Sequence, residues 1–400
     1  MIKQTKFKNN GRFFNNLLLF LFILFLPTQL GKHFFFPFAY LSGVRVDYLA
    51  PTLYLTDIIA LLLLLLNLKL VLKAFLKKKL LIFIGFLVVT VFVSTSGMLV
   101  LYGIAKLIEL IIIFFVLRQT KKTDKLILIA FTIGALGEII IAVLELIERH
   151  SVGGLFYFLG ERTFSLGTLG IAKAALFGTE ILRPYASFSH PNSLAGFYLL
   201  LYFFYLTKRN FENFFLKNIL LLASSLIIFF SFAKFIILVF LFLNLVYLLR
   251  NTWKKCRLCT IAKIIIIGVL SLIFFQARGD PQDLEKRLLL TKDALRIFLN
   301  HSVLGVGLNN YLLYQQNFPI KYLDLLNQPV HNVFLLVLTE VGIVGTIMIL
   351  VFLYKRIIKI VLSYPYVASA IILTGLFDHY WLTLQQNFLL LGVIAGLALF

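Results

Sequence analysis

Polar residues open an apolar run near the end of the chain, in the stretch QPVHNVFLLVLTEVGIVG at residues 328–345. His331 and Asn332 stand at the start of the run, and Glu340 lies within it. A helix that only crosses lipid needs none of these groups, because ionisable side chains within a membrane are costly and are functional by default. An imidazole exchanges a proton near neutral pH, so His331 is a candidate for acid–base chemistry.

Arginines in the loops are the second informative residue type. A guanidinium holds a phosphate group in a planar fork, so a loop arginine is a candidate anion ligand. The alternative is an ion pair with a nearby acid, which is favoured for Arg296, whereas both alternatives stay open for Arg183 and Arg287. The loop arginines are Arg162, Arg183, Arg278, Arg287 and Arg296, and the acids are Glu161, Glu180, Asp283, Glu285 and Asp293.

Composition predicts the elements that must position these residues. Of the 400 residues, 61% are hydrophobic, and the mean hydropathy is +0.97. Soluble domains are less apolar, and a bilayer core requires runs of roughly 20 apolar residues. We therefore predict an all-α polytopic membrane protein, a single membrane domain over 1–400 with about twelve transmembrane helices. The predicted spans lie near 13–30, 52–70, 80–95, 98–117, 126–147, 188–206, 215–231, 235–249, 264–277, 331–353, 361–377 and 382–400.

The basic residues predict the orientation of these spans. Lys and Arg concentrate on the cytoplasmic side of membrane proteins. Placing both termini inside puts most of the 38 Lys and Arg residues into the inner loops. The net charge of +21 is therefore a topology signal, and no nucleic-acid partner is predicted.

This orientation places the residues with chemical potential on the outer side. The outer segments are 31–51 and the two long loops 148–187 and 278–330. All six histidines also fall on the outer side of this topology, namely His33, His150, His190, His301, His331 and His379. The inner loops are short, and their Cys256 and Cys259 form a lone CxxC motif without the roughly four ligands of a zinc site. We therefore predict an active site on the outer face and no metal site at the cysteines.

Helical periodicity appears again in the large outer loop 278–330. Apolar residues recur at helical spacing with charges between them, which predicts an amphipathic helix lying on the membrane surface. These residues are Leu288, Leu289, Ala294, Leu295 and Phe298.

Charged residues within the spans have a structural interpretation. Lys106 and Glu138 lie at similar depths in consecutive spans, so we predict a structural Lys106–Glu138 pair. Glu340 is half a helical turn out of phase with His331. It therefore points away from that histidine, and we predict that it ties its span to a neighbouring segment.

Four stretches together resemble the O-antigen ligase and O-antigen polymerase family. They are RPYASFSHPNSLAGF (183–197), RLLLTKDALRIFLNHSVLGVGLNNY (287–311), VHNVFLLVLTEVGIVG (330–345) and GLFDHYWLTLQQNFLLLGVIAGL (375–397). The resemblance covers the span layout and most of the C-terminal two thirds, with the ligase-like region at about 183–345. The chain departs from the family pattern at Ser302, where Pro is usual, and at Thr291, where an aromatic residue is common.

The resemblance implies an enzyme similar to C-type membrane glycosyltransferases of the cytoplasmic (inner) membrane. Such enzymes take a glycan from a polyprenyl-diphosphate carrier and pass it to a glycan or lipid acceptor, with no metal, nucleotide sugar or other cofactor. By motif, Arg183 and Arg287 hold the diphosphate, and His331 activates the acceptor hydroxyl. Candidate substrate-binding residues are His190, Asn192, Asn332, Asn309, Arg162 and Arg278.

The chemistry agrees with this implication. Two guanidinium groups can neutralise the charge that develops on a diphosphate leaving group, and helix N-termini favour anions. We expect attack from the face opposite the diphosphate, which inverts the anomeric centre.

Several alternatives stay open. A secondary transporter or flippase for a lipid or sugar also has many spans and buried acids, although no internal repeat is visible in this chain. A binding scaffold without turnover is a further alternative. If the protein is an enzyme, the sequence does not distinguish a ligase from a polymerase or a protein-directed transferase.

Overall fold

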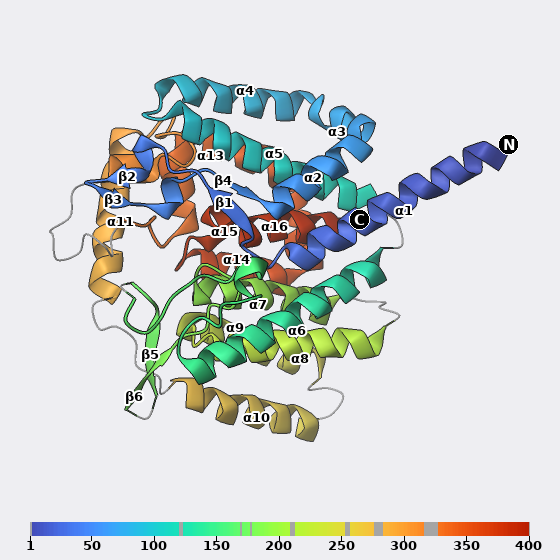
Figure 1. Cartoon of the computed structure of the whole chain (residues 1–400), viewed down its shortest axis with the longest axis vertical. Helices are drawn as coiled ribbons and strands as arrows, with labels where there is room; N and C mark the ends of the chain where they lie inside the picture. The colour runs from blue at the N-terminus through green and yellow to red at the C-terminus, as the bar shows by residue number, and fades with distance from the viewer. Residues whose placement is uncertain are drawn as a thin grey trace. The chain divides into compact units, whose positions relative to one another are not determined.

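The computed structural model describes residues 2–119, 123–168, 170–176, 178–208, 213–252, 257–275, 283–315 and 327–399 (Figure 1). Most of these residues are helical. The chain forms two compact units, of which the first comprises Met1–Phe131, Leu284–Ser363 and Gly375–Phe400. The second comprises Thr132–Asp283 and Tyr364–Thr374. The single membrane domain predicted over 1–400 stays a prediction.

The first unit contains helices from both ends of the chain. They are α1 (Ile2–Phe25), α2 (Leu55–Leu66), α3 (Leu68–Phe75), α4 (Lys78–Val93), α5 (Gly97–Gln119), α11 (Asp283–Asn300), α13 (Val333–Ser363), α15 (Tyr380–Thr383) and α16 (Gln385–Ala398). Its short elements are β1 (Gly31–His33), η1 (Pro37–Ala39), β2 (Tyr40–Leu41), β3 (Val44–Arg45), η2 (Asp47–Leu49), β4 (Thr52–Tyr54) and η4 (Tyr311–Tyr314).

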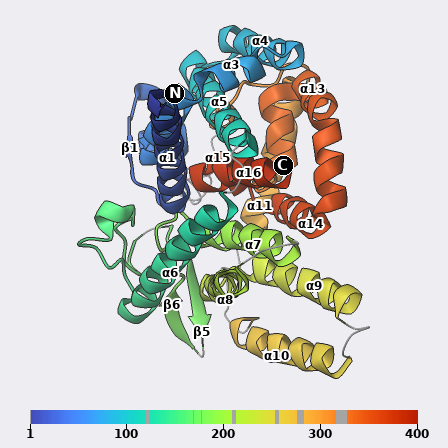
Figure 2. The ribbon, with the colours of Figure 1, turned by 90° about the vertical axis from the view of Figure 1, so that its right-hand side faces the viewer.

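The second unit contains most of α6 (Asp124–Glu148), whose residues from Thr132 onward belong to it. Its other elements are η3 (Tyr157–Leu159), β5 (Lys173–Leu176), β6 (Thr179–Leu182), α7 (Pro191–Thr207), α8 (Phe214–Phe230), α9 (Lys234–Asn251), α10 (Arg257–Phe275) and nearly all of α14 (Pro365–Gly375). Within this unit α7 packs against α8 and α9, and α10 packs against α9 (Figure 2).

The structure agrees with the predicted spans in their positions along the chain but not in their number. Each predicted span overlaps a described helix. Among the described residues, however, four helices are long and apolar enough to cross a membrane, namely α5, α6, α9 and α13. The number rises to five if α2 and α3, which meet at a bend of 92°, form one broken span. Helices such as α14 and α16 are shorter than a straight span requires, so the prediction of about twelve spans is not confirmed.

The all-α prediction also omits short strands. In the described part of the chain, antiparallel ladders join β1 to β4, β2 to β3, and β5 to β6. Each lies in a segment between helices, where backbone N–H and C=O groups need partners. Strands of two to four residues show too little alternation of apolar and polar residues to be predicted from the sequence.

Helix α16 packs closely against α5 in the first unit (Figure 2). The contact uses Gly392 and Gly396, four residues apart on one face of α16. A Cβ on Gly392 would lie 3.1 Å from the carbonyl oxygen of Leu110, and one on Gly396 would lie 3.1 Å from that of Phe114. Small residues at this spacing let two membrane helices approach backbone to backbone.

Helix α13 is interrupted at Gly342, whose backbone has φ 64° and ψ −172°. The segment 302–307 pairs with the backbone on both sides of the break. The hydrogen bonds run from Val306 N to Thr339 O (2.9 Å), Gly307 N to Glu340 O (2.9 Å), Ile343 N to Ser302 O (2.8 Å) and Val344 N to Val303 O (3.2 Å). We refer to this pairing of 302–307 with 339–344 as the backbone clasp.

The buried carboxylate of Glu340 lies beside the backbone clasp. It accepts hydrogen bonds from the backbone N–H groups of Asn309 and Tyr311. This contact supports the predicted role of Glu340 in tying its span to a neighbouring segment.

The predicted Lys106–Glu138 pair stays a prediction, and Lys106 has other acidic partners within the first unit. The Nζ atom of Lys106 lies 2.5 Å from Asp57 Oδ2 and 3.7 Å from Glu109 Oε2, which joins α2 to α5. Gln385, at the start of α16, donates to Asp57 Oδ1 at 2.7 Å and to Glu109 Oε2 at 3.1 Å. Within the first unit, Lys106 thus finds one partner, Asp57, in a distant part of the sequence.

Helix α11 is amphipathic, as predicted, but its apolar residues divide between two faces. Leu290, Ala294 and Ile297 are buried. Leu288 and Leu295, which the sequence places in one stripe with Ala294, are 55% and 46% exposed. The exposed apolar face supports the predicted position of this helix on a membrane surface.

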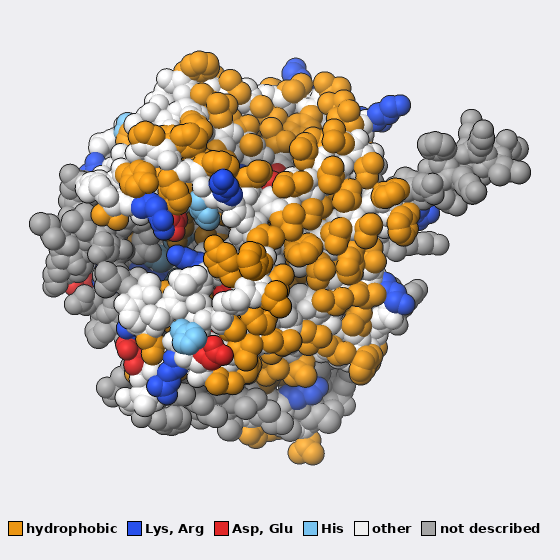
Figure 3. All heavy atoms as spheres, in the orientation of Figure 1, with side chains coloured by type: hydrophobic (Ala, Val, Ile, Leu, Met, Phe, Trp, Pro, Cys, Tyr) orange, Lys and Arg blue, Asp and Glu red, His pale blue; other side chains and the backbone are white. Residues whose placement is uncertain are grey.

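Hydrophobic side chains cover much of the face drawn in Figure 3, and charged side chains are sparse among them. Phe92 on α4 is 84% exposed, and Leu222 on α8 is 63% exposed. Large apolar side chains exposed along apolar helices indicate surfaces that lipid covers.

Candidate functional site

His331 lies two residues before α13, in the first unit. Asn332 caps this helix, because its side-chain Oδ1 accepts a hydrogen bond from Leu335 N at 3.0 Å. The side-chain Nδ2 of Asn332 donates to Leu376 O at 3.3 Å. The cap fixes the end of α13 at His331 and links it to the segment that precedes Asp378.

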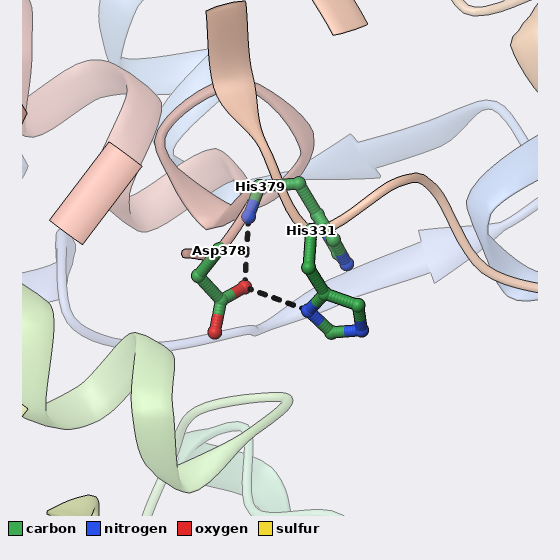
Figure 4. Close-up of side chains that lie close together, drawn as sticks. All are labelled: His331, Asp378 and His379. Carbon is green, nitrogen blue, oxygen red and sulfur yellow. Dashed lines mark hydrogen bonds and ion pairs between the residues drawn. The ribbon is translucent and has the colours of Figure 1, made fainter. Parts of the chain in front are cut away.

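Asp378 and His379 meet His331 in the first unit (Figure 4). The Nδ1 atom of His331 lies 3.7 Å from Asp378 Oδ1, and the two side chains are only 15% and 12% exposed. This Nδ1 atom is buried and has no hydrogen-bond partner among the described residues. The other ring nitrogen, Nε2, points away from Asp378 (Figure 4). Asp378 Oδ1 also accepts a hydrogen bond from the backbone N–H of His379 at 2.8 Å.

His379 is fully enclosed in the connection between α14 and α16. Its ring lies 5.1 Å from that of His331 and 5.5 Å from that of Tyr48, between ring centres. Its Nδ1 lies 2.7 Å from Thr383 Oγ1. Burial lowers the pKa of His379 to about 3, although Asp378 opposes the effect. The neighbouring His331 and Arg287 lower it further, so His379 is neutral at physiological pH.

Arg287 on α11 contacts the same segment. Its Nη1 donates to Phe377 O at 2.7 Å, one residue before Asp378. The structure therefore brings together Arg287 and His331, two of the three residues predicted to be catalytic, through the segment 376–379.

The same cluster contains atoms of the kind that bind metals. His331, Asp378 and His379 each offer one such atom, and these atoms lie within 4.8 Å of one another. Two imidazoles and a carboxylate can hold a divalent transition metal. The positive charge of Arg287, which lowers the pKa of His379, opposes a cation at the same cluster. The prediction that the protein needs no metal stays a prediction.

The third predicted catalytic residue, Arg183, lies in the second unit with three predicted substrate-binding residues. Its Nη2 donates to Asn192 Oδ1 at 2.7 Å, and its Nε donates to Ser231 O at 3.0 Å. His190 caps α7 by accepting a hydrogen bond from Asn192 N at 3.1 Å. Arg162 donates to Ser189 O at 3.2 Å. Two guanidiniums therefore lie near the N-terminus of α7, a location that favours anions.

Two buried carboxylates on α6 hold the turn between Arg183 and α7. Glu145 Oε2 accepts hydrogen bonds from the N–H groups of Tyr185 and Ala186, each at 2.8 Å. Glu138 accepts from Ser187 N at 3.0 Å and from its hydroxyl at 2.5 Å. Glu138 and Glu145 are seven residues apart and share one helix face. The predicted structural role of Glu138 stays a prediction, which these contacts support.

The remaining predicted residues have other surroundings. Asn309 has a left-handed backbone (φ 59°), and its Nδ2 lies 3.5 Å from Leu99 O. Arg278 lies outside the described residues. Arg296 forms the favoured ion pair, since its Nη2 lies 2.7 Å from Asp293 Oδ1. The pairing interpretation is therefore confirmed for Arg296.

Sequence reasoning assigned no role to Asp378 and His379. The signal was the Asp–His pair ahead of the last predicted span, within a stretch that contributes to the family resemblance. The pair is separated from His331 by 46 intervening residues, so only the fold shows that these side chains meet.

The apolar helices of membrane-spanning length indicate an integral membrane protein. Its candidate active site is the polar cluster at the start of α13. The family model for O-antigen ligase matches residues 194–350, which include Arg287 and His331. The match, which covers less than half of the chain, confirms the resemblance to this family that is seen in the sequence. It further supports an O-antigen ligase-like function in surface polysaccharide biosynthesis and a glycosyltransferase-like enzyme. No curated protein showed a significant sequence match to the chain.

Proposed function

We propose that this protein transfers a glycan from a polyprenyl-diphosphate carrier to an acceptor hydroxyl at the outer face of the cytoplasmic membrane. The observation that carries the proposal is the cluster in which His331 Nδ1 faces Asp378 Oδ1 at 3.7 Å while Arg287 is fastened to Phe377 O. A proton acceptor can activate the attacking hydroxyl, and a guanidinium can neutralise the diphosphate leaving group. The family match is the second support.

His331 is the general base in this proposal. Asp378 accepts the Nδ1–H of the imidazole, which leaves the Nε2 lone pair for the acceptor hydroxyl. The distance of 3.7 Å is longer than a hydrogen bond. Such contacts are often long without substrate and shorten when it binds. Asp378 then stabilises the imidazolium that forms as the hydroxyl attacks the anomeric carbon.

The arginines bind the leaving group. Arg287, beside His331, neutralises the charge that develops on the diphosphate oxygen as the glycosidic bond breaks, and the family resemblance implies the same role for Arg183. Arg162, His190 and Asn192 assist Arg183 at the N-terminus of α7, and Asn309, Asn332 and Arg278 are further substrate-binding candidates. Guanidinium groups supply the positive charge, so no metal is required. Attack from the face opposite the diphosphate inverts the anomeric centre.

The test is glycan transfer by the purified protein in liposomes, with a polyprenyl-diphosphate-linked donor. We expect His331→Ala, Arg287→Ala and Arg183→Ala each to lower the rate by about 100-fold or more. The wild-type rate should survive EDTA, and NMR of the product should show an inverted anomer. A transporter or flippase would tolerate His331→Ala and Arg287→Ala, and that result would overturn the proposal.

The acceptor is identified in cells. Deletion of the gene should remove either the attachment of a surface glycan, as for a ligase, or its chain length, as for a polymerase. Loss of a glycan from a protein would instead indicate a protein-directed transferase.

A further inference from the structure

The outer loop after α6, in the second unit, carries an exposed apolar segment that the proposed chemistry does not use. Leu155, Tyr157, Phe158 and Leu159 are 80%, 57%, 68% and 43% exposed. We refer to Leu155–Leu159 as the apolar tip. The stretch from Gly153 to Gly160 contains no charged residue. Large side chains exposed together in this way mark a contact surface.

The backbone around the apolar tip is firmly closed. At the base of the loop, Ser151 N donates to Phe164 O at 3.0 Å, and Phe164 N donates to Ser151 Oγ at 3.1 Å. The buried carboxylate of Glu161 accepts hydrogen bonds from Val152 N at 2.6 Å and Gly153 N at 2.7 Å. Phe164 packs against Tyr185, with ring centres 4.8 Å apart. The apolar side chains are therefore presented by a loop whose base is held by hydrogen bonds and ring packing.

Lipid is the partner that fits the apolar tip. Ile147, in the last turn of the candidate membrane helix α6, is 71% exposed, and Ile140, about two turns earlier, is 54% exposed. The lipid-facing surface of α6 thus continues to the end of the helix. The backbone from Glu148 to Leu155 can extend at most about 25 Å, which keeps the apolar tip near that membrane boundary. Tyr is enriched at membrane interfaces, and Phe and Leu are side chains that insert into them.

We propose that the apolar tip inserts into the leaflet at which α6 ends, the outer leaflet in the predicted topology. The insertion anchors Arg162, which is the residue after Glu161 in the sequence and donates a hydrogen bond to Ser189 O. The apolar tip thereby holds one wall of the Arg183 region at the depth of a lipid headgroup. This last consequence rests on the proposed function, whereas the insertion itself does not.

The insertion is measured with a fluorescent probe on one cysteine. Cys256 and Cys259 are changed to Ser, and an environment-sensitive probe is attached to Phe158→Cys or, as the matched control in the same loop, to exposed Thr163→Cys. In liposomes we expect doxyl-labelled phosphatidylcholine to quench the probe at 158 and aqueous iodide to leave it unquenched. The probe at 163 should show the reverse.

Quenching by iodide at 158 as strong as at 163 would overturn the insertion. Shielding at 158 without lipid quenching, if it grew with protein density in the membrane, would indicate contact with a second copy and would also overturn it. Because the measurement needs no substrate, it stands even if the protein proves to have no transferase activity.

A kinetic measurement tests the anchoring of Arg162. For Leu155→Ser/Phe158→Ser in liposomes, we expect the KM for a long-chain donor to rise by about fivefold. The KM for a short-chain, water-soluble donor in detergent should stay unchanged. An equal rise for both donors would show a general distortion of the loop and would contradict the anchoring.

Discussion

Gly305 and Gly342 pack backbone against backbone at the centre of the backbone clasp. A Cβ on Gly305 would lie 2.6 Å from Gly342 N, and a Cβ on Gly342 would lie 2.6 Å from Gly305 N. Gly342 also has a left-handed φ of 64° with an extended ψ, a conformation that is nearly restricted to glycine. Two residues 37 positions apart thus determine where α13 is interrupted, nine residues after the start of the helix that follows His331.

Gly342→Ala should therefore strongly destabilise the protein. The added Cβ would clash with Val303 O, and alanine resists this backbone conformation. We expect a loss of about 3 kcal/mol or more of folding free energy, measured as a lower melting temperature in detergent. Gly85→Ala on α4 is the matched control, because a Cβ there meets nothing within 4 Å. An equal effect of the two substitutions would contradict the importance of this contact.

Asp378→Asn should slow transfer by about 100-fold or more with little change in stability. The amide no longer stabilises the imidazolium of His331. We expect the double variant His331→Ala/Asp378→Asn to be no slower than His331→Ala alone, because both residues act in one step. His301→Gln, at an exposed histidine, should keep near wild-type activity. Additive effects of His331→Ala and Asp378→Asn would show that Asp378 acts independently of the base.

Acidification should destabilise the protein through His379. Its pKa falls from an ordinary value of 6.5 to about 3 in the folded state. The unfolded chain therefore binds a proton between these values while the folded protein does not. Stability is fully present above pH 6.5 and decreases as the pH falls, by at most about 1.4 kcal/mol per pH unit from this group. Melting temperatures from pH 7.5 to 5 should fall less for His379→Gln than for the wild type, and parallel curves would contradict the assignment.

Glu145→Leu should weaken donor binding. It leaves the buried N–H groups of Tyr185 and Ala186 without their acceptor, at a cost of roughly 1–3 kcal/mol each. The turn that follows Arg183 then shifts, so we expect KM for the donor to rise more than kcat falls. Glu145→Gln should restore much of the KM, because an amide oxygen can accept the same hydrogen bonds. If Glu145→Gln were as defective as Glu145→Leu, the charge rather than the hydrogen bonding would be essential.

Lys106→Met should destabilise the first unit by about 3–5 kcal/mol, because Asp57 loses its cation in a buried setting. The double variant Lys106→Met/Asp57→Asn should recover part of this loss, since the remaining amide carries no charge. Thermal unfolding of the three proteins provides the measurement. A double variant less stable than Lys106→Met would contradict the pairing.

The sequence was sufficient for features that depend on local pattern. Continuous apolar runs predicted where helices lie, and the acids near Arg296 in the sequence favoured an ion pair for that arginine over binding of an anion. The lengths of the helices were harder to predict from the sequence. The apolar run at 52–70 does not show that the chain bends at Asn67, where α2 ends and α3 begins.

Features that depend on distant partners were beyond the sequence. Lys106 pairs with Asp57 because the fold places α2 beside α5 in the first unit. Asp378 meets His331 only because the segment 376–379 is fixed by Asn332 and Arg287. The interruption at Gly342 leaves no trace in hydropathy, since the groups that compensate for it are main-chain atoms of 302–307.

The backbone clasp has a consequence for how such a protein can diversify. Its hydrogen bonds join main-chain groups, so they place little demand on the identity of the side chains apart from the glycines. Exposed positions of the segment 302–307, such as Val303, can therefore change while the segment stays hydrogen-bonded to the same points of α13. Because the backbone clasp depends on main-chain hydrogen bonds, the surface of this segment can change during evolution while α13, which follows His331, keeps its position.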